Sequence, residues 1–286
     1  MVTMIRLIKN SFSATLYAVR THKKLFILLI FFQILVLVFL FTHAFQAQLA
    51  IGKDLQQLGL QIQQANYNPE ELKAGKAFVQ DPLQVFQLYR SLKKNLLLFA
   101  VQFGGIFLLG QGILWLGTHF LFRKNNELRK WNEFRQQIFK YLATVFSFYG
   151  LFFLVFYLVI KSQLSAMDAQ ILGTTLRYFG YAFLMMYYFL TMALAFLYIP
   201  EWKVFFNCWF QFAVKRYYFS LPIFIISLLP AAAGFYGIFY AVQIQSSFPL
   251  MLLFTLVFIL FLVLGRIFFI ASLRELASKE KIENMG

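Results

Sequence analysis

Charged residues and cysteine are scarce in this chain of 286 residues. Only 13% of the residues are charged, and Cys208 is the one cysteine. A single cysteine excludes an intrachain disulfide and a metal site built from several cysteines. A soluble domain is about 45–50% apolar and about 25% charged, whereas 61% of this chain is hydrophobic. The composition therefore favours burial in a membrane over burial in a water-soluble core.

Long apolar runs account for this composition, and short polar breaks separate them. A helix needs about 20 apolar residues to cross the hydrocarbon core of a bilayer. The six runs are Leu25–Ala44, Leu96–Phe122, Tyr141–Ile160, Tyr178–Ile199, Tyr218–Tyr240 and Phe248–Ile270. They predict an all-α polytopic membrane protein with six transmembrane helices and interfacial amphipathic helices on the inner face. Residues 1–286 are expected to form a single integral membrane domain.

Two further expectations concern the first run and the orientation. The first run exceeds the ~7–15 apolar residues of a signal peptide, so we expect it to be retained. With a cytoplasmic N-terminus, most of the 26 basic residues fall in the inner segments, as the positive-inside rule requires. We therefore expect a multi-pass protein of the inner, cytoplasmic membrane with both termini in the cytoplasm.

The net charge of +15 is explained by that same orientation. Cations beside the membrane attract the anionic headgroups of the inner leaflet, so membrane lipids are the expected partners. The pattern also allows protein partners within the membrane. It requires no nucleic acid, because the positive-inside distribution accounts for the excess charge.

Two segments are predicted to lie flat at the inner face. Within the inner-surface segment 1–24, apolar residues recur at spacings of three and four beside cations, which indicates an interfacial amphipathic helix. That apolar stripe consists of Ile5, Ile8, Phe12, Leu16 and Val19. Residues 200–217 are too aromatic for a solvated loop and suit the headgroup region. The candidate inner-leaflet interface consists of Lys23, Lys24, Trp202, Trp209, Lys215 and Arg216.

The largest segment outside the membrane, residues 51–94, is expected to form an outer helical hairpin. Asn68-Pro69 and Asp81-Pro82 both carry the N-cap and first-turn proline of a helix start. The second helix should carry Val85, Leu88, Tyr89 and Leu92 on one face and run on into the second span.

Two charged segments are assigned to the inner side. The loop at residues 123–140 is predicted to be helical, with Glu133 and Lys140 of opposite charge on an exposed face. Residues 273–286 are short and charged and are expected to form a cytoplasmic tail.

A surface helix followed by two spans recurs three times. It reflects either an internal repeat or similar anchors placed before each inward-starting span. The recurring positions are Phe12, Lys24, Phe134, Phe205 and Lys215, with the span after each. This layout resembles the six-span membrane domain that accompanies bacterial glycerophosphodiester phosphodiesterases, and related uncharacterised membrane families of bacteria and archaea. The resemblance covers the whole chain. It implies a membrane module without an activity, because the phosphodiesterase domain has no counterpart here.

Acidic and basic residues are missing from the middle of the predicted spans, which argues against proton-coupled transport and voltage sensing. Arg177 and Arg266 lie near span ends and are expected to reach headgroups by snorkelling. His43 and His119 are interpreted as polar span ends. The candidate midplane polar layer consists of Gln33, Gln111, Tyr187, Tyr188, Thr191 and Ser227. Such a layer either lines a solute cavity or makes interhelical hydrogen bonds; we favour the latter.

Small residues predict which spans pack closely. Pro222 and Pro230 should bend the fifth span, and Ala233 with Gly237 gives it small-xxx-small spacing. Ala100 and Gly104 give the second span the same spacing. These two spans are therefore the candidates for close central packing.

Catalytic motifs are also missing from the sequence: there is no H-E-x-x-H, no P-loop and no pair of mid-span aspartates. We expect no catalytic residues, no metal site and no cofactor, and hence no enzymatic activity. The favoured function is a non-enzymatic membrane module for partner assembly or lipid organisation. The alternatives are a facilitator or permease for a neutral or amphipathic solute, with a cavity at Gln33, Gln111 and Tyr187, and a lipid-acting membrane enzyme.

Overall fold

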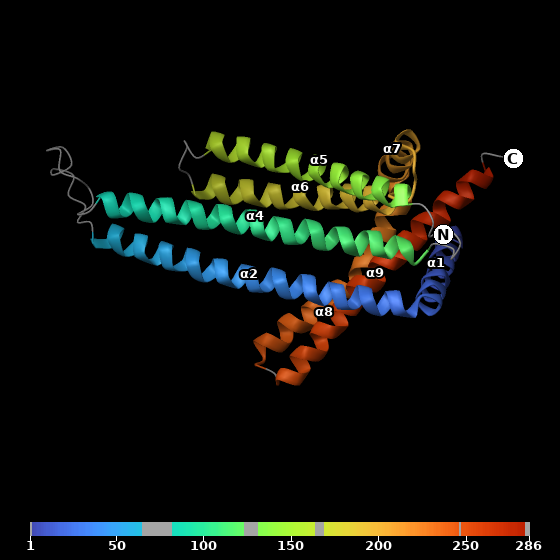
Figure 1. The fold of residues 1–286 in the computed structure, drawn as a ribbon, viewed down its shortest axis with the longest axis horizontal. Helices are drawn as coiled ribbons and strands as arrows, with labels where there is room; N and C mark the ends of the chain where they lie inside the picture. The colour runs from blue at the N-terminus through green and yellow to red at the C-terminus, as the bar shows by residue number, and fades with distance from the viewer. Residues whose placement is uncertain (1, 65–81, 123–130, 164–168, 246, 284–286) are drawn as a thin grey trace. The chain divides into compact units, whose positions relative to one another are not determined.

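The computed structural model describes residues 2–64, 82–122, 131–163, 169–245 and 247–283 (Figure 1). Every regular element in these ranges is a helix, which confirms the predicted all-α class. The α-helices are α1 (Val2–Thr21), α2 (Lys23–Gln64), α4 (Pro82–Phe120), α5 (Trp131–Gln163), α6 (Ala169–Ala195), α7 (Trp202–Phe210), α8 (Tyr217–Gln243) and α9 (Phe248–Glu283). A π-helix, η2 (Gln211–Lys215), follows α7 directly. Helices suit these apolar runs because they satisfy their backbone hydrogen bonds internally.

Five helices in the described residues are long and apolar enough to cross a membrane. The five candidate spans are Lys23–Gln61 in α2, Leu83–Phe120 in α4, Phe134–Val155 in α5, Tyr217–Gln243 in α8 and Phe248–Ser278 in α9. Five of the six predicted runs therefore fall in such helices. The remaining run corresponds to α6, in which Gly180–Ala195 is a shorter apolar stretch.

The chain divides into two compact units. Unit 1 comprises residues 1–33 and 112–286, and unit 2 comprises residues 34–111. Helices α2 and α4 each contribute to both units, and unit 2 consists of these two helices alone among the described residues.

Polar side chains join α2 to α4 within unit 2. The buried Asp54 carboxylate accepts hydrogen bonds from Ser91 Oγ at 3.0 Å and from Asn95 Nδ2 at 2.8 Å. Gln61 Nε2 donates to Gln84 Oε1 at 3.0 Å. Except for Asn95, the residues that make these contacts lie within the segment 51–94, for which a helical hairpin was predicted, and they join helices whose outward faces stay exposed.

The predicted helix start at Asp81-Pro82 is confirmed, because α4 begins at Pro82 and continues through the second predicted span. The other predicted start, Asn68-Pro69, lies outside the described residues. Helix α2 continues to Gln64 instead of ending with the first apolar run, since most of the polar residues that follow are good helix formers. Tyr89 was expected on the apolar face of α4 but is exposed.

Helices α8 and α9 form a closely packed pair within unit 1. A Cβ added at Gly265 of α9 would overlap the backbone oxygen of Ser227 in α8. A Cβ at Gly234 would lie 2.9 Å from the Cα of Phe258, so the two backbones approach each other closely at both glycines. Helix α8 runs through both of its prolines as one helix.

The predicted close packing of the fifth span is found at Gly237, where a Cβ would lie 2.7 Å from the Phe254 ring, but the partner is α9 and not the second span. Ala233 is exposed, and a Cβ at Gly104 would meet nothing within 4 Å. The side chain of Ala100 lies outside the described residues. The helix that packs against α8 is α9. The buried small residues of α8 are Ser227, Ala231, Gly234 and Ala241. Spacing alone did not distinguish this face from the neighbouring one.

Helix α1 confirms the predicted helix at the start of the chain and has two distinct faces, whereas its predicted place at the inner surface stays a prediction. Leu7, Ser11, Thr15 and Ala18 form its buried face, and α1 packs against α9. The hydroxyls of Ser11 and Thr15 donate to carbonyls one turn back in α1, which allows their burial. The predicted apolar stripe points elsewhere, because Ile5, Phe12 and Leu16 remain exposed.

The predicted tail at residues 273–286 is largely a continuation of α9, which ends at Glu283. Leu273 and Leu276 are buried in this part of the helix. Asn10 Nδ2 of α1 donates to Glu275 Oε1 at 3.1 Å. The contact with α1 explains why these residues stay helical despite their charge.

Gly265→Ala should destabilise unit 1, because its Cβ would overlap a backbone oxygen that cannot rotate away. Overpacking of this kind costs about 1–3 kcal/mol. Gly150→Ala in α5 is the matched control, since a Cβ there meets nothing within 4 Å. Thermal unfolding of the detergent-solubilised protein should show a lower midpoint for Gly265→Ala alone. Equal midpoints for the two variants would contradict the close contact between α8 and α9.

Candidate functional site

The junction between α6 and α7 is built around a buried lysine. Ile199 and Pro200 lie after the end of α6 and before Glu201, whose carbonyl is the first helical acceptor of α7, so their own carbonyls accept no bond within either helix. Lys140 Nζ, from α5, donates to Ile199 O at 2.6 Å and also to Pro200 O. The Lys140 side chain is only 1% exposed. One ammonium group therefore satisfies two backbone oxygens where the helical pattern breaks.

Aromatic rings complete the surroundings of Lys140. Its Nζ lies 5.2 Å from the ring centre of Trp202 and 5.7 Å from that of Phe205. Cation–π attraction of this kind strengthens when the cation is desolvated. The lysine thus attaches α5 to the first turn of α7.

The expectation that Lys140 lies on an exposed face with Glu133 is wrong for the lysine. Lys140 shares a helix face with Gln137, Tyr141 and Thr144, and all of them are buried. The side chain of Glu133 lies outside the described residues. Polar residues at spacings of three and four along an apolar helix were the signal that could have identified this face.

Helix α7 and the π-helix η2 occupy the aromatic segment that was predicted to lie flat at the inner face. Phe205 and Phe212 are buried, whereas Phe206 and Phe210 remain exposed. Trp209 Nε1 donates to Phe189 O in α6 at 3.0 Å. The buried side therefore fixes the segment on α6, and the other side carries exposed aromatic rings.

Two hydroxyl groups fix the turn from η2 into α8. Ser220 Oγ donates to Phe212 O at 2.7 Å. The hydroxyl of Tyr188 lies 2.7 Å from Ser220 Oγ and 3.3 Å from Ala213 O. A π-helical turn shifts the register of its backbone hydrogen bonds, and the Ser220 hydroxyl supplies a donor to the Phe212 carbonyl within that turn.

Arg274 and His119 join three helices at the same end of unit 1. Arg274 Nη2 lies 3.3 Å from His119 Nδ1, and His119 Nε2 lies 2.9 Å from Leu194 O in α6. Since a guanidinium only donates, Nδ1 is the acceptor and the proton is on Nε2. The guanidinium also lies 4.3 Å from the ring centre of Tyr198. His119 lies in the last turn of α4, as the interpretation as a polar span end expects, but it is only 1% exposed and points into unit 1.

Arg266 lies inside unit 1 and does not snorkel as expected. Its Nη2 donates to Gln33 Oε1 at 3.2 Å, and its Nη1 atom is buried. The guanidinium lies 5.6 Å from the ring centre of Trp115. Tyr141 and Tyr187 are close enough to interact with its charge. A buried amide acceptor and an aromatic face replace the headgroup contact that the sequence predicted.

The residues of the predicted midplane layer have different roles. Gln33 accepts a hydrogen bond from Arg266, and the Tyr187 ring lies 6.1 Å from that of Phe224, whereas the Tyr188 hydroxyl lies beside Ser220 at the turn into α8. Thr191 donates to Tyr187 O and Ser227 donates to Phe224 O, each one turn back or less in its own helix. Gln111 belongs to unit 2, whereas the other five belong to unit 1.

The residues of the predicted inner-leaflet interface are mostly at the surface. Lys23, Lys24 and Lys215 are exposed, and Trp202 is 36% exposed. Arg216 is half-buried at the elbow before α8. The exception is Trp209, whose ring packs against Phe148 and Phe189. It anchors α7 to α5 and α6 instead of facing outward.

Two cavities in unit 1 adjoin α7. One of about 660 Å³ lies beside the start of α5, and another of about 150 Å³ lies between α5 and α7. Gln33, Gln111 and Tyr187, which the permease alternative needs around a cavity, do not line either of them. The described residues contain no cluster of three or more His, Cys, Asp or Glu side chains that could hold a metal ion.

Comparison with known proteins found no family model, no curated protein and no solved structure that matches this chain. The resemblance to the phosphodiesterase-associated membrane domain therefore stays a prediction. The features that bear on its function are the exposed cations and aromatic rings of α1 and α7 and the buried contacts that fix these helices.

Lys140→Met should loosen α7, because it removes the donor to two backbone oxygens while keeping the aliphatic stem. A buried acceptor left without its donor costs about 1–3 kcal/mol. Lys203→Met, at an exposed position in α7, is the control. Hydrogen exchange of the amides in residues 202–210 should be at least tenfold faster in Lys140→Met and unchanged in Lys203→Met. Unchanged exchange in Lys140→Met would contradict the anchoring role.

Proposed function

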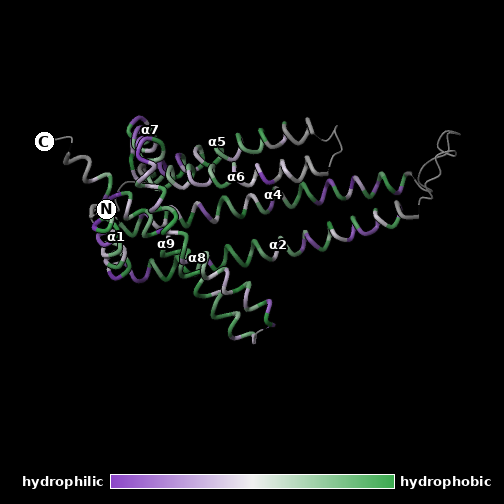
Figure 2. Tube along the Cα trace, turned by 180° about the vertical axis from the view of Figure 1, so that it is seen from behind, coloured by the Kyte–Doolittle hydropathy of each residue, from purple (hydrophilic) through white to green (hydrophobic). Residues whose placement is uncertain are grey.

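We propose that this chain is a six-span protein of the cytoplasmic membrane that organises anionic lipid at the inner leaflet, without enzymatic activity. The observation that carries the proposal is the pair of surface helices, α1 and α7, in unit 1. Both lie at the end of unit 1 where α5 begins and α6 ends (Figure 1). Figure 2 shows hydrophilic and hydrophobic residues mixed along both helices, whereas α8 is hydrophobic over most of its length.

The contact between α1 and α9 supports six crossings over five. Helix α1 precedes the first span, and its Asn10 contacts Glu275 at the C-terminal end of the last candidate span, Phe248–Ser278. Their contact requires both ends of the chain to lie on the same side of the membrane. Only an even number of crossings does that, so α6 supplies the sixth span.

The side chains of α1 and α7 match an anionic lipid surface. Exposed apolar residues of both helices can enter the headgroup region: Ile5, Phe12, Leu16 and Tyr17 in α1, and Val204, Phe206 and Phe210 in α7. Exposed cations accompany them: Arg6, Lys9, Arg20, Lys23, Lys24, Lys203 and Lys215. An apolar face flanked by Lys and Arg is the pattern by which helices bind anionic interfaces. We name these residues the inner belt.

The inner belt is rigidly held, which favours organisation of lipid over transient binding. The buried sides of α7 and η2 are fixed by the hydrogen bonds of Lys140, Trp209 and Ser220. The face of α1 that carries Leu7 packs on α9. A surface that needs no ordering on binding loses less free energy to entropy.

Labelling of engineered cysteines tests the orientation. In a Cys208→Ser background, Lys23→Cys should be protected from a membrane-impermeant maleimide in intact spheroplasts, and Lys93→Cys should react. Lysis should expose the first site as well. Both lysines are exposed in the fold, so a difference reports the side of the membrane. Reaction of Lys23→Cys without lysis would sink the proposed orientation.

Charge reversal at the inner belt tests the lipid role. The protein is released from vesicles of equal phosphatidylglycerol and phosphatidylcholine, and retained lipids are counted by native mass spectrometry. Each cation near an anionic surface contributes about 1 kcal/mol. Lys23→Glu with Lys24→Glu should lower the ratio of retained phosphatidylglycerol to phosphatidylcholine at least fivefold.

The matched control replaces the same two lysines by arginine, which preserves the charge and should preserve the ratio. A wild-type protein that retains both lipids equally would contradict the proposed function. So would an unchanged ratio in the double Glu variant, provided that its thermal midpoint matches that of the wild type.

A further inference from the structure

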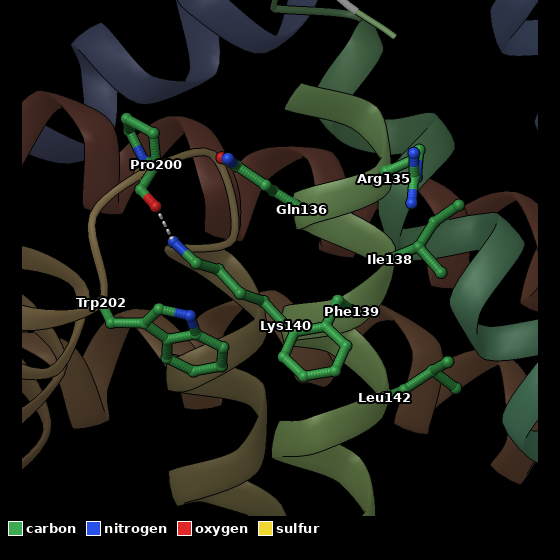
Figure 3. Close-up of a pocket in the computed structure, with 8 residues that line it drawn as sticks. All are labelled: Arg135, Gln136, Ile138, Phe139, Lys140, Leu142, Pro200 and Trp202. Atoms are coloured by element: carbon green, nitrogen blue, oxygen red, sulfur yellow. Dashed lines mark hydrogen bonds between the residues drawn. The ribbon is translucent and has the colours of Figure 1, made fainter. Parts of the chain in front are cut away.

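The cavity of about 660 Å³ beside α7 is a groove along the start of α5 (Figure 3). Figure 3 shows Arg135, Ile138 and Leu142 along one side of the helix and Lys140 on the side toward Trp202, with Phe139 between them. The remaining lining residues are Gln136 and Pro200. Its volume of about 660 Å³ lies within the ~300–1,000 Å³ of typical ligand sites.

Polarity changes along the groove in the direction of the helix axis. Arg135 and Gln136 are in the first turns of α5 and both are exposed. Leu142 follows Arg135 by seven residues, which places it about 10 Å further along the helix. Ile138 and Phe139 lie between the two ends. The groove is thus cationic and polar at its mouth and apolar at its deep end.

The position of the groove matches a level in the bilayer. The candidate span in α5 begins at Phe134, so Arg135 lies at the boundary between headgroups and hydrocarbon. Phe139 is 64% exposed, and Leu142 and Trp202 are each 36% exposed. Apolar surface of this size at this depth faces acyl chains and not water.

Lys140 gives the groove a fixed wall. Its ammonium group is held by the Ile199 and Pro200 carbonyls and lies under the ring of Trp202. The wall is therefore formed before anything binds, which favours affinity. Glu201 interacts with Lys140 and offsets part of its charge. The two cations Arg135 and Lys140 keep the groove positive overall.

We propose that this groove binds one anionic diacyl phospholipid of the inner leaflet. Arg135 holds the phosphate, for which a guanidinium offers two parallel donors. The acyl chains straddle Phe139, one along Ile138 and Leu142 and the other against Trp202. The proposal rests on the proposed function for the leaflet from which the lipid comes. It goes further by naming a specific site with a stoichiometry of one.

Native mass spectrometry of the full chain, released from mixed phosphatidylglycerol and phosphatidylcholine vesicles, tests the site. At a collision energy that strips surface lipid, the wild type should retain one phosphatidylglycerol and no phosphatidylcholine. Arg135→Gln and Phe139→Ala should each lose it. Two controls should keep it: Lys203→Gln removes a belt cation outside the groove, and Phe146→Ala removes a ring of nearly equal exposure, 62%, two turns further along α5.

Photo-crosslinking to the wild type gives a second test that does not depend on whether the variants fold. Phosphatidylglycerol with a diazirine in its acyl chain should label the wild-type peptides that contain Leu142 and Trp202 at least fivefold more than the peptide that contains Leu151. Equal labelling would overturn the proposal, as would retention of phosphatidylcholine or unchanged retention in both groove variants.

The Lys23→Glu and Lys24→Glu variant separates the groove site from the lipid role of the inner belt, because it should lower bulk phosphatidylglycerol yet keep the single tight lipid. Loss of the tight lipid in that variant would show that the belt, and not the groove, holds it.

Discussion

Backbone oxygens that have lost their helical donors are the constraint on which unit 1 depends. Hydrocarbon offers no water to satisfy them, and the chain must nevertheless leave α6 and turn into α7. Lys140 resolves this by donating to the carbonyls of Ile199 and Pro200. The same ammonium group holds the ring of Trp202. The direction of α7, the outward face of its aromatic residues and one wall of the groove all follow from this contact.

Two half-buried arginines of unit 1, Arg266 and Arg274, follow the same rule. Arg266 is held by the Gln33 amide and the face of Trp115, and Arg274 by His119 and the ring of Tyr198. In each case the contacts described are with neutral acceptors and aromatic rings. Such contacts let a charge stay within a membrane protein at a lower cost than an isolated cation would incur. A chain with 39 phenylalanines has many such faces to offer.

The sequence predicted what each helix needs to bury but not which neighbour it meets. Long apolar runs predicted the helices, and Asp81-Pro82 predicted where α4 begins, because these signals are local. Lys140 and Arg266 were misplaced, since a polar residue near the end of a run looks the same whether it points outward or inward. The close packing of α8 was assigned to Ala233 for a similar reason: spacing identifies a small-residue face only when the partner helix is known. The residues of the candidate polar layer take different roles for the same reason: which helices are neighbours cannot be read from the spacing of residues along one helix.

The length of α2 argues that its two ends meet different solvents. A helix of 42 residues is about 63 Å long, twice the roughly 30 Å of the hydrocarbon core. Near its start, Gln33 accepts a hydrogen bond from the half-buried Arg266; further along, Asp54 accepts bonds from a hydroxyl and an amide of α4. In the second setting the Asp54 carboxylate is buried, and two polar side chains of α4 satisfy it. Unit 1 therefore uses cations on aromatic faces, and unit 2 uses hydrogen-bonded polar pairs. The change of solvent along one continuous helix explains both.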